Sequence, residues 1–139
     1  MNHLKNTVGY QIMLLKENII EETKDEFKKS NITHEEYITL HYIYENPGIT
    51  QVALAKINRR DNNVISKRID KLEQKNFVER IRDTDKDRRA FYLYLTEKGN
   101  AIIDEYWHIF LDGETRGLKN LSADEKIIFK NLLQKIILT

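Results

Sequence analysis

Apolar positions at the start of the chain recur every three or four residues, which is the period of an amphipathic α-helix. The series is Leu4, Val8, Ile12, Leu15 and Ile19. It predicts one long helix over residues 4–28. Further apolar side chains in this segment widen the hydrophobic part beyond a single stripe, so we expect the helix to be covered on two sides.

The same period returns in two segments near the end of the chain. Thr96 is expected to cap a helix that continues through residue 111, and Ser122 and Glu125 have the spacing of a capping box at the start of the last helix. That last helix stays apolar to its final residues, although chain ends are usually polar and frayed. We therefore expect a second chain to cover it.

Capping signals also mark the middle of the chain. Thr33 and Glu36 have capping-box spacing, which predicts a helix that starts there and ends before Pro47. Ile49 follows as a short strand that is expected to pair with a later hairpin.

A helix, a turn and a second helix are predicted next. Thr50 is expected to cap the first helix over residues 51–57, residues 58–60 make the turn, and Asp61 caps the second helix. The apolar stripe of this second helix is Ile65, Ile69 and Leu72. Its other face is polar and consists of Asn62, Asn63, Ser66, Lys67 and Lys71. Side chains of these types reach base edges and phosphates.

Two strands follow, over residues 77–82 and 91–95, joined by a charged loop over residues 83–89. The second strand alternates aliphatic and aromatic positions, as a hairpin with one covered face does. A polar helix followed by a hairpin with a basic tip is the layout of a winged helix-turn-helix. The expected fold class is therefore mainly α with a small β-hairpin.

The charge of the chain is polarised along the sequence, although its 139 residues carry a formal total of only +1. Residues 56–89 hold twelve Lys or Arg and seven Asp or Glu, a net +5, whereas the other 105 residues hold eleven basic and fifteen acidic residues, a net −4. A basic concentration over a predicted reading helix and hairpin is the electrostatic pattern of a nucleic-acid-binding surface.

Composition excludes several classes of protein. With no cysteine there is no disulfide and no thiol-based redox sensing. The N-terminus lacks the apolar core of a signal peptide, and no apolar run approaches the roughly 20 residues of a membrane span. We expect one compact domain in the cytoplasm, without a membrane partner.

The residues around the hairpin resemble the signature of the MarR family of bacterial transcriptional regulators. The resemblance rests on Val78-Glu79-Arg80, Asp83, Asp87-Arg88-Arg89 and Leu95-Thr96-Glu97-Lys98-Gly99. The helix exit before it also fits, with Asn76 where the family usually has Gly; Asn tolerates the left-handed conformation that a helix end needs. The specific part of the match is residues 61–99.

The resemblance implies a single domain over residues 1–139 with a winged helix-turn-helix over residues 31–99. Residues 1–30 and 100–139 would form helices of a homodimer. The implied order is helix, helix, strand, helix, helix, strand, wing, strand, helix, helix. The implied function is a repressor that binds double-stranded DNA at a pseudo-palindromic operator and is released by a small ligand.

The resemblance also implies roles for individual residues. The reading helix would enter the major groove with Asn62, Asn63, Ser66 and Lys67, and Lys71 would contact phosphate. In the wing, Arg89 would enter the minor groove and Asp87 would orient it by an ion pair. The remaining predicted phosphate contacts are Arg59, Arg60 and Arg88.

A small aromatic or amphipathic ligand is expected between the dimer helices and the reading module, and no cofactor is expected. The candidate pocket walls are Tyr10, Tyr37, Tyr44, Trp107 and Phe110. Each of these aromatic residues fits a place in the hydrophobic core better than a place in a pocket wall, so the sequence leaves the ligand unidentified.

The sequence leaves three alternatives to a ligand-responsive regulator. An enzyme is disfavoured because no Ser/His/Asp order and no Gly-rich phosphate loop is present. A metal-responsive regulator of the same fold would use histidines, and the candidates are His34, His41 with Glu45, and His108; these positions do not make a complete site. The third alternative is a winged-helix dimer that binds only proteins, which the basic wing disfavours.

Overall fold

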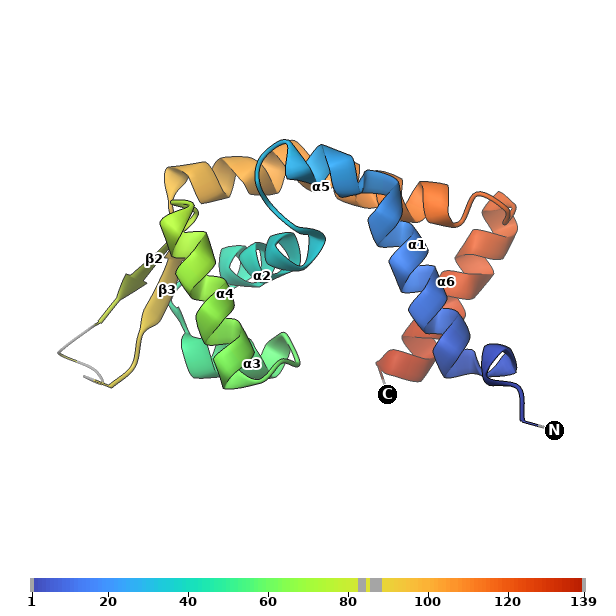
Figure 1. Cartoon of the computed structure of the whole chain (residues 1–139), viewed down its shortest axis with the longest axis horizontal. Helices are drawn as coiled ribbons and strands as arrows, with labels where there is room; N and C mark the ends of the chain where they lie inside the picture. The colour runs from blue at the N-terminus through green and yellow to red at the C-terminus, as the bar shows by residue number, and fades with distance from the viewer. Residues whose placement is uncertain (1, 83–84, 86–88, 139) are drawn as a thin grey trace. The chain divides into compact units, whose positions relative to one another are not determined.

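The computed structural model describes residues 2–82, 85 and 89–138. It is mainly helical with a small antiparallel sheet (Figure 1). In chain order the elements are a 3-10 turn η1 (Leu4–Asn6), α1 (Val8–Lys28), α2 (His34–Glu45), β1 (Ile49–Thr50), α3 (Gln51–Ile57), α4 (Asn62–Gln74), β2 (Val78–Ile81), β3 (Tyr92–Leu95), α5 (Glu97–Gly117) and α6 (Ala123–Ile137). This order confirms the predicted winged helix-turn-helix.

The chain forms two compact units. One consists of Met1–Asp25 together with His108–Thr139, and the other is Glu26–Trp107. Helices α1 and α5 each contribute residues to both units. The predicted helix-turn-helix and hairpin lie entirely within Glu26–Trp107, which we call the reading unit; the other is the terminal unit.

The core of the reading unit is built from the end of α1, from α2, α3 and α4, from the strands and from the first half of α5. Its most deeply buried large side chains are Phe27, Tyr37, Leu40, Ile43, Leu54, Ile65, Ile69, Leu72, Phe77 and Leu93. The Tyr37 hydroxyl donates to the carbonyl oxygen of Ile103 at 2.9 Å, which joins α2 to α5. Burial, and then the nearby carboxylate of Asp104, raise the pKa of Tyr37 to about 12. This hydroxyl therefore remains a hydrogen-bond donor at neutral pH.

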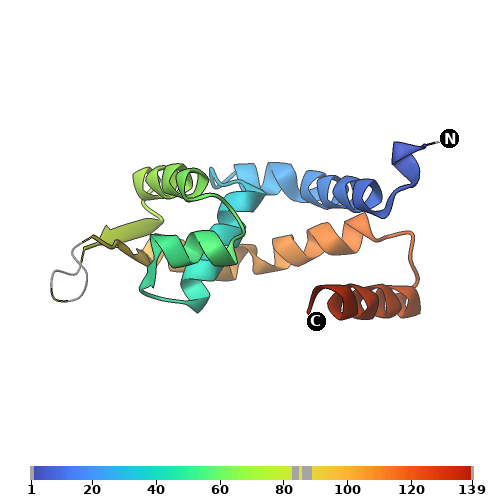
Figure 2. The ribbon, with the colours of Figure 1, turned by 90° about the horizontal axis from the view of Figure 1, so that it is seen from below.

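The sheet has the order β1-β3-β2, so β3 is its central strand. Ile49 of β1 lies opposite Leu93, and Arg80 of β2 lies opposite the same residue on the other side. The prediction that Ile49 forms a short strand against the hairpin is confirmed. In two views the strands β2 and β3 extend away from α3 and α4 (Figures 1 and 2).

The predicted helix starts are confirmed by their hydrogen bonds. Both capping boxes are present, with Thr33 and Glu36 at α2 and with Ser122 and Glu125 at α6. The hydroxyl of Thr50 accepts from the backbone N–H of Ala53 at the start of α3. After α4 the chain turns at Asn76, whose φ of 65° is the left-handed conformation that its sequence position suggested.

The prediction of one continuous helix over residues 4–28 is wrong at Thr7. This residue has extended backbone angles (φ −80°, ψ 145°) and separates η1 from α1. Its hydroxyl donates to the carbonyl oxygen of Leu4 and accepts from the N–H of Tyr10. Threonine thus serves as a cap where the apolar period alone suggested a helix interior.

In the terminal unit, α1 and α5 approach closely at two glycines. A Cβ atom on Gly117 would lie 2.6 Å from the Cγ1 of Ile19, and one on Gly113 would lie 3.1 Å from the Ile19 carbonyl oxygen. By contrast, α6 keeps a stripe of exposed apolar side chains, Ile128, Leu132 and Ile136, which are 58%, 53% and 71% exposed. Cover by a second chain remains a prediction for this stripe. Among the described residues, no helix combines the length and apolarity of a membrane span.

Candidate nucleic-acid interface

The turn between α3 and α4 is fixed by a buried asparagine. Asn58 ends α3 and is only 7% exposed, and its side-chain oxygen accepts from the hydroxyl of Thr39 at 2.7 Å. The same hydroxyl accepts from the guanidinium of Arg68 at 3.1 Å. Arg59 follows with a φ of 53°, and its side chain is exposed. These contacts set the direction in which α4 leaves the turn.

Helix α4 begins at a tight cap, because the Asp61 carboxylate accepts from the N–H of Asn63 at 2.7 Å. Ile65, Ile69 and Leu72 are fully buried, which confirms the predicted apolar stripe. The residues predicted to contact DNA are exposed, except for the half-buried Ser66: Asn62, Asn63, Lys67 and Lys71. At 3.6 residues per turn, Asn63 and Lys67 lie opposite the buried stripe.

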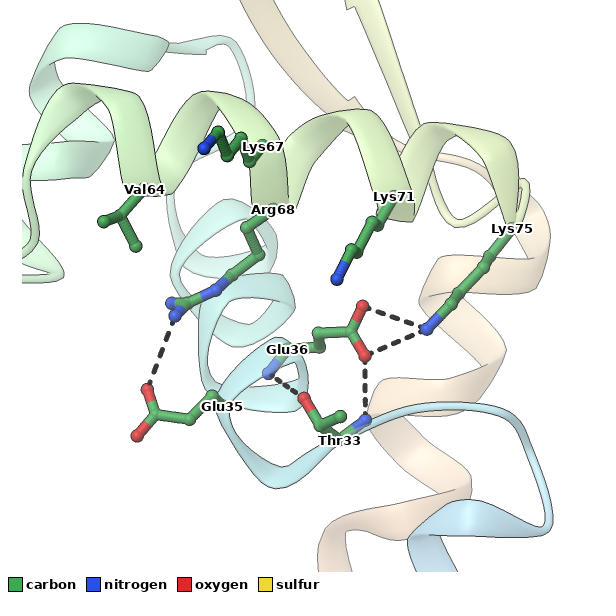
Figure 3. A pocket seen from close by; sticks show the side chains of 8 residues that line it. All are labelled: Thr33, Glu35, Glu36, Val64, Lys67, Arg68, Lys71 and Lys75. Carbon is green, nitrogen blue, oxygen red and sulfur yellow. Dashed lines mark hydrogen bonds and ion pairs between the residues drawn. The ribbon is translucent and has the colours of Figure 1, made fainter.

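One flank of α4 faces the first turn of α2 across a groove of about 360 Å³ (Figure 3). Glu35 accepts from Arg60 at 3.4 Å and lies 3.8 Å from Arg68. The ammonium of Lys75 lies 3.0 Å from both carboxylate oxygens of the buried Glu36. Two adjacent glutamates of α2 therefore hold α4 at its first half and at its end.

These ion pairs reduce the positive charge that residues 56–89 can present to DNA. Arg60, Arg68 and Lys75 neutralise carboxylates of α2 rather than adding to an open positive surface. Within residues 2–82, 85 and 89–138, Lys67 and Lys71 form no ion pair and remain exposed. Figure 3 shows Lys71 projecting from α4 into the groove between Arg68 and Lys75. Lys67 and Lys71 are thus the cations of α4 that are available to a phosphate.

The other flank of α4 meets strand β2 through Arg80. Its guanidinium lies 2.6 Å from the carboxylate of Asp70 and 3.9 Å from that of Glu73, and it donates to the backbone carbonyl of Ser66 at 3.0 Å. The Phe91 ring of the hairpin lies 5.7 Å from the same guanidinium. Arg80 thereby links the hairpin to α4.

The described part of the hairpin carries two further arginines. The guanidinium of Arg82 lies 4.5 Å from the centre of the Phe91 ring, and Arg89 is exposed. Asp87 and Arg88 lie outside the described residues. The expected ion pair between Asp87 and Arg89 therefore remains a prediction.

The aromatic residues predicted to line a ligand pocket fall into three places. Tyr37 is buried in the core of the reading unit. Tyr44 and Trp107 are 46% and 42% exposed, and their rings lie 5.9 Å and 5.1 Å from the ring of His41, which stands between them. Tyr10 and Phe110 are half-buried in the terminal unit. The structure therefore brings together Tyr44 and Trp107, with His41 as a neighbour that the sequence had not suggested for this role.

The histidines considered as metal ligands are in different surroundings. His41 lies 3.0 Å from the Glu45 carboxylate, and His34 contacts the ring of Phe27 edge-on at 5.8 Å. His108 belongs to the terminal unit. No cluster of three or more His, Asp or Glu side chains suited to a metal occurs in the described part of the chain.

Sequence reasoning did not identify the structural roles of Arg68, Lys75 and Arg80. For Arg80 the signal was present, because strand period places it on the same face as the buried Val78. For Arg68 and Lys75 the helical period predicts the flank of α4 on which each side chain lies, but it does not predict the carboxylate with which each one pairs. Their partners on α2 depend on how the two helices pack.

Residues 32–91 match the profile described as MarR family. The HTH-type transcriptional regulator BilQ of Clostridium symbiosum (strain WAL-14163) is 30% identical over 133 residues, which are 96% of this chain and 92% of that protein. A crystal structure of a MarR mutant from E. coli complexed with operator DNA has a TM-score of 0.84 and 26% identity, and the alignment covers 98% of this chain and 99% of that one. For the S. aureus MepR–DNA complex the TM-score is 0.82 at 26% identity, with 94% and 96% covered.

Proposed function

Because this chain belongs to the MarR family of transcriptional regulators, we propose that it is a repressor that binds a pseudo-palindromic operator as a homodimer and is released by a small ligand. The observation that carries this proposal is the exposed polar face of α4 beside the hairpin, in a fold shared with two protein–DNA complexes. A dimer seated on a promoter blocks polymerase without a further contact surface, which favours repression. The site of action would be the bacterial cytoplasm.

In the proposed complex, α4 lies in the major groove. Asn62 and Asn63 stand on its first turn, where helix-turn-helix proteins contact base edges. An asparagine pairs with adenine through two hydrogen bonds, and Lys67 can donate to guanine. Ser66 suits either kind of base, although its carbonyl is already bound by Arg80.

Other positively charged residues would contact the DNA backbone or the minor groove. Lys71 and Arg59 are exposed and would meet phosphates, as would Arg88. Arg60 would contact a phosphate only by breaking its hydrogen bond with Glu35, so we propose that it contributes less to DNA affinity. Arg89 would enter the minor groove, oriented by Asp87.

A dimer is proposed because one reading helix makes too few contacts for tight, specific binding. The exposed apolar stripe of α6 and the exposed Leu4, Val8 and Ile12 at the other end of the chain support this proposal. Apolar surface of this extent is unusual on a monomer. Two-fold pairing would bury it and would present two copies of α4 to two half-sites.

Release by a ligand would follow from differential affinity. A ligand that prefers a dimer with altered helix spacing weakens DNA binding by its coupling free energy. The proposed walls are Tyr44 and Trp107 of the reading unit; Tyr10 and Phe110, which belong to the terminal unit, stay predictions from the sequence. Tyr37 would support these walls from the core.

The test is fluorescence anisotropy of the protein against labelled DNA from its own upstream region and against scrambled DNA, at two salt concentrations. We expect tighter binding to the upstream fragment by a factor that survives the higher salt, because base contacts are less salt-dependent than phosphate contacts. Equal binding to both fragments, together with failure to enrich any sequence from a random pool, would instead support an interaction dimer that does not read DNA.

Lys71→Ala is expected to weaken binding to operator and scrambled DNA by a similar factor. Removing one phosphate contact should also flatten the dependence of log affinity on log salt by about 1. Anisotropy across a salt series measures both quantities, and Lys119→Ala, an exposed lysine of the terminal unit, serves as the control. A loss confined to one base position would contradict the phosphate role.

Arg89→Ala is expected to cost about 1–3 kcal/mol of operator affinity, as a specific groove contact does. The loss should be larger for an operator whose flanks are A·T-rich than for one whose flanks are G·C-rich, because the narrow minor groove of A·T segments attracts guanidinium. Competition binding with the two flank variants measures this difference. Unchanged affinity for both would rule out the wing assignment.

A further inference from the structure

Arg80 joins strand β2 to helix α4 at three residues of one flank. It donates to the backbone carbonyl of Ser66 at 3.0 Å and lies 2.6 Å from the carboxylate of Asp70 and 3.9 Å from that of Glu73. These three positions recur at helical spacing and follow one side of α4 over two turns. One side chain from the hairpin therefore contacts the reading helix on two successive turns.

The surroundings of Arg80 indicate a structural rather than a solvated charge. Its side chain is only 16% exposed, and its Nε is buried with no hydrogen-bond partner in the described part of the chain. The Phe91 ring lies 5.7 Å from the guanidinium. A partly buried charge is costly to desolvate and adds little net stability even when paired, so its burial points to the fixing of one geometry.

That geometry matters because β2 leads directly into the wing. Arg80 stands one residue before the end of β2, and its partner Leu93 is on the central strand β3. A planar guanidinium that binds several acceptors on α4 restricts both the distance and the angle between helix and hairpin. A DNA complex in which α4 reads the major groove and the wing reads the minor groove requires both to be placed at once.

We propose that Arg80 is a positioning residue that holds the wing at the angle to α4 at which both engage DNA together. The inference rests on the proposed function, since it assigns a role within the same DNA complex. Arg80 does not itself contact DNA in this proposal. Its positive charge is already matched by Asp70, and its guanidinium is directed at α4.

The proposal predicts that Arg80 and Arg89 act as a unit. An operator selected from a random pool by the wild-type protein is used for a double-mutant cycle with Arg80→Met and Arg89→Ala. Arg89→Ala should weaken operator binding by about 5-fold to 150-fold in the wild type. In the Arg80→Met background the same substitution should cost less than about threefold, because the wing is no longer held in place. Equal penalties in both backgrounds would overturn the proposal.

Two variants separate positioning from charge. Arg80→Lys keeps the charge but loses the fork that reaches several acceptors, so the Arg89→Ala penalty should remain small in it. Arg82→Met changes the neighbouring hairpin arginine, whose guanidinium stacks on Phe91, and the full Arg89→Ala penalty should persist. A full penalty in Arg80→Lys would show that charge alone suffices and would overturn the positioning role.

Asp70→Asn provides the same test without altering the hairpin, in case Arg80→Met does not fold by circular dichroism. It removes the closest partner of Arg80 while leaving β2 unchanged. Under the proposal, the Arg89→Ala penalty falls in this variant. If the carboxylate only repelled DNA, Asp70→Asn would raise affinity and leave that penalty intact, which would overturn the proposal.

Operator enrichment by the wild-type protein distinguishes a wrong positioning role from a wrong proposed function. If the wild-type protein enriches an operator and the Arg89→Ala penalty is independent of Arg80, the positioning role alone is wrong. If the wild-type protein enriches no sequence at either salt concentration, the proposed function is overturned, and the positioning role falls with it.

Discussion

Gly99→Ala is expected to lower the free energy of unfolding by about 3 kcal/mol, the upper end of the usual cost of overpacking. A Cβ atom at this position would lie 2.2 Å from the carbonyl oxygen of Phe77 and 3.3 Å from the Cβ of Leu95. The nearer atom belongs to the backbone, so no side-chain rotation can relieve the contact. The start of α5 would have to move away from the segment that follows α4.

That movement would break several hydrogen bonds at once. The Phe77 carbonyl accepts from the N–H of Thr96 at 3.1 Å, and the Thr96 hydroxyl donates to the carbonyl of Asn76 at 2.6 Å. The ammonium of Lys98 donates to the carbonyl of Lys75 at 2.9 Å. These contacts hold the first turn of α5 against the end of α4, which explains why the cost should exceed that of one crowded atom.

Thermal unfolding followed by circular dichroism measures this effect, with an expected drop in Tm on the order of 10 °C. Gly9→Ala is the matched control, because a Cβ on Gly9 would meet nothing within 4 Å and alanine is the better helix former. The midpoint of that variant should stay or rise. A Gly99→Ala midpoint equal to that of the wild type would contradict the close approach of α5 to Phe77.

Leu132→Asp combined with Ile136→Asp is expected to dissociate the proposed dimer and to lower operator affinity at least about 100-fold. Burying a leucine or isoleucine side chain stabilises an interface by about 1.5–3 kcal/mol. In a two-fold dimer each substitution occurs twice. The summed loss is therefore about 6–12 kcal/mol, comparable to the whole binding free energy of a nanomolar dimer.

Light scattering after size exclusion measures the mass directly. The wild type should have twice the 16.6 kDa of one chain, and the double variant should have 16.6 kDa. Asn131→Asp adds a charge to the same helix outside the stripe and should remain dimeric. A dimeric double variant with unchanged operator affinity would exclude α6 from the interface.

The features that the sequence predicted well depend on neighbours along the chain. A capping residue such as Thr50 or Asp61 contacts a backbone N–H only two or three residues away, so the pattern and the contact are nearly the same observation. The buried stripe of α4 likewise follows from helical period. Helical period fails at Thr7, because the apolar spacing continues across this residue although its hydroxyl caps the start of α1.

The ion pairs that hold α4 were not predictable in the same way. The Lys75 ammonium binds Glu36, which lies 39 residues earlier in the chain, and Arg68 pairs with Glu35, which lies 33 residues earlier. Their pairing depends on how α2 packs against α4. The count of charges over residues 56–89 treats every basic side chain as part of one surface. In the structure, Arg68, Lys75 and Arg80 instead contact neighbouring elements.

Because ion pairs with α2 occupy one flank of α4 and contacts with Arg80 occupy the other, the exposed strip formed by Asn63, Lys67 and Lys71 is left without an ion pair inside the described part of the protein. If α4 reads the operator as proposed, substitutions in this strip should alter which bases are preferred while the residues that hold the helix stay unchanged. Under the proposed function, operator preference and folding stability would be encoded by separate sets of positions on the same thirteen-residue helix.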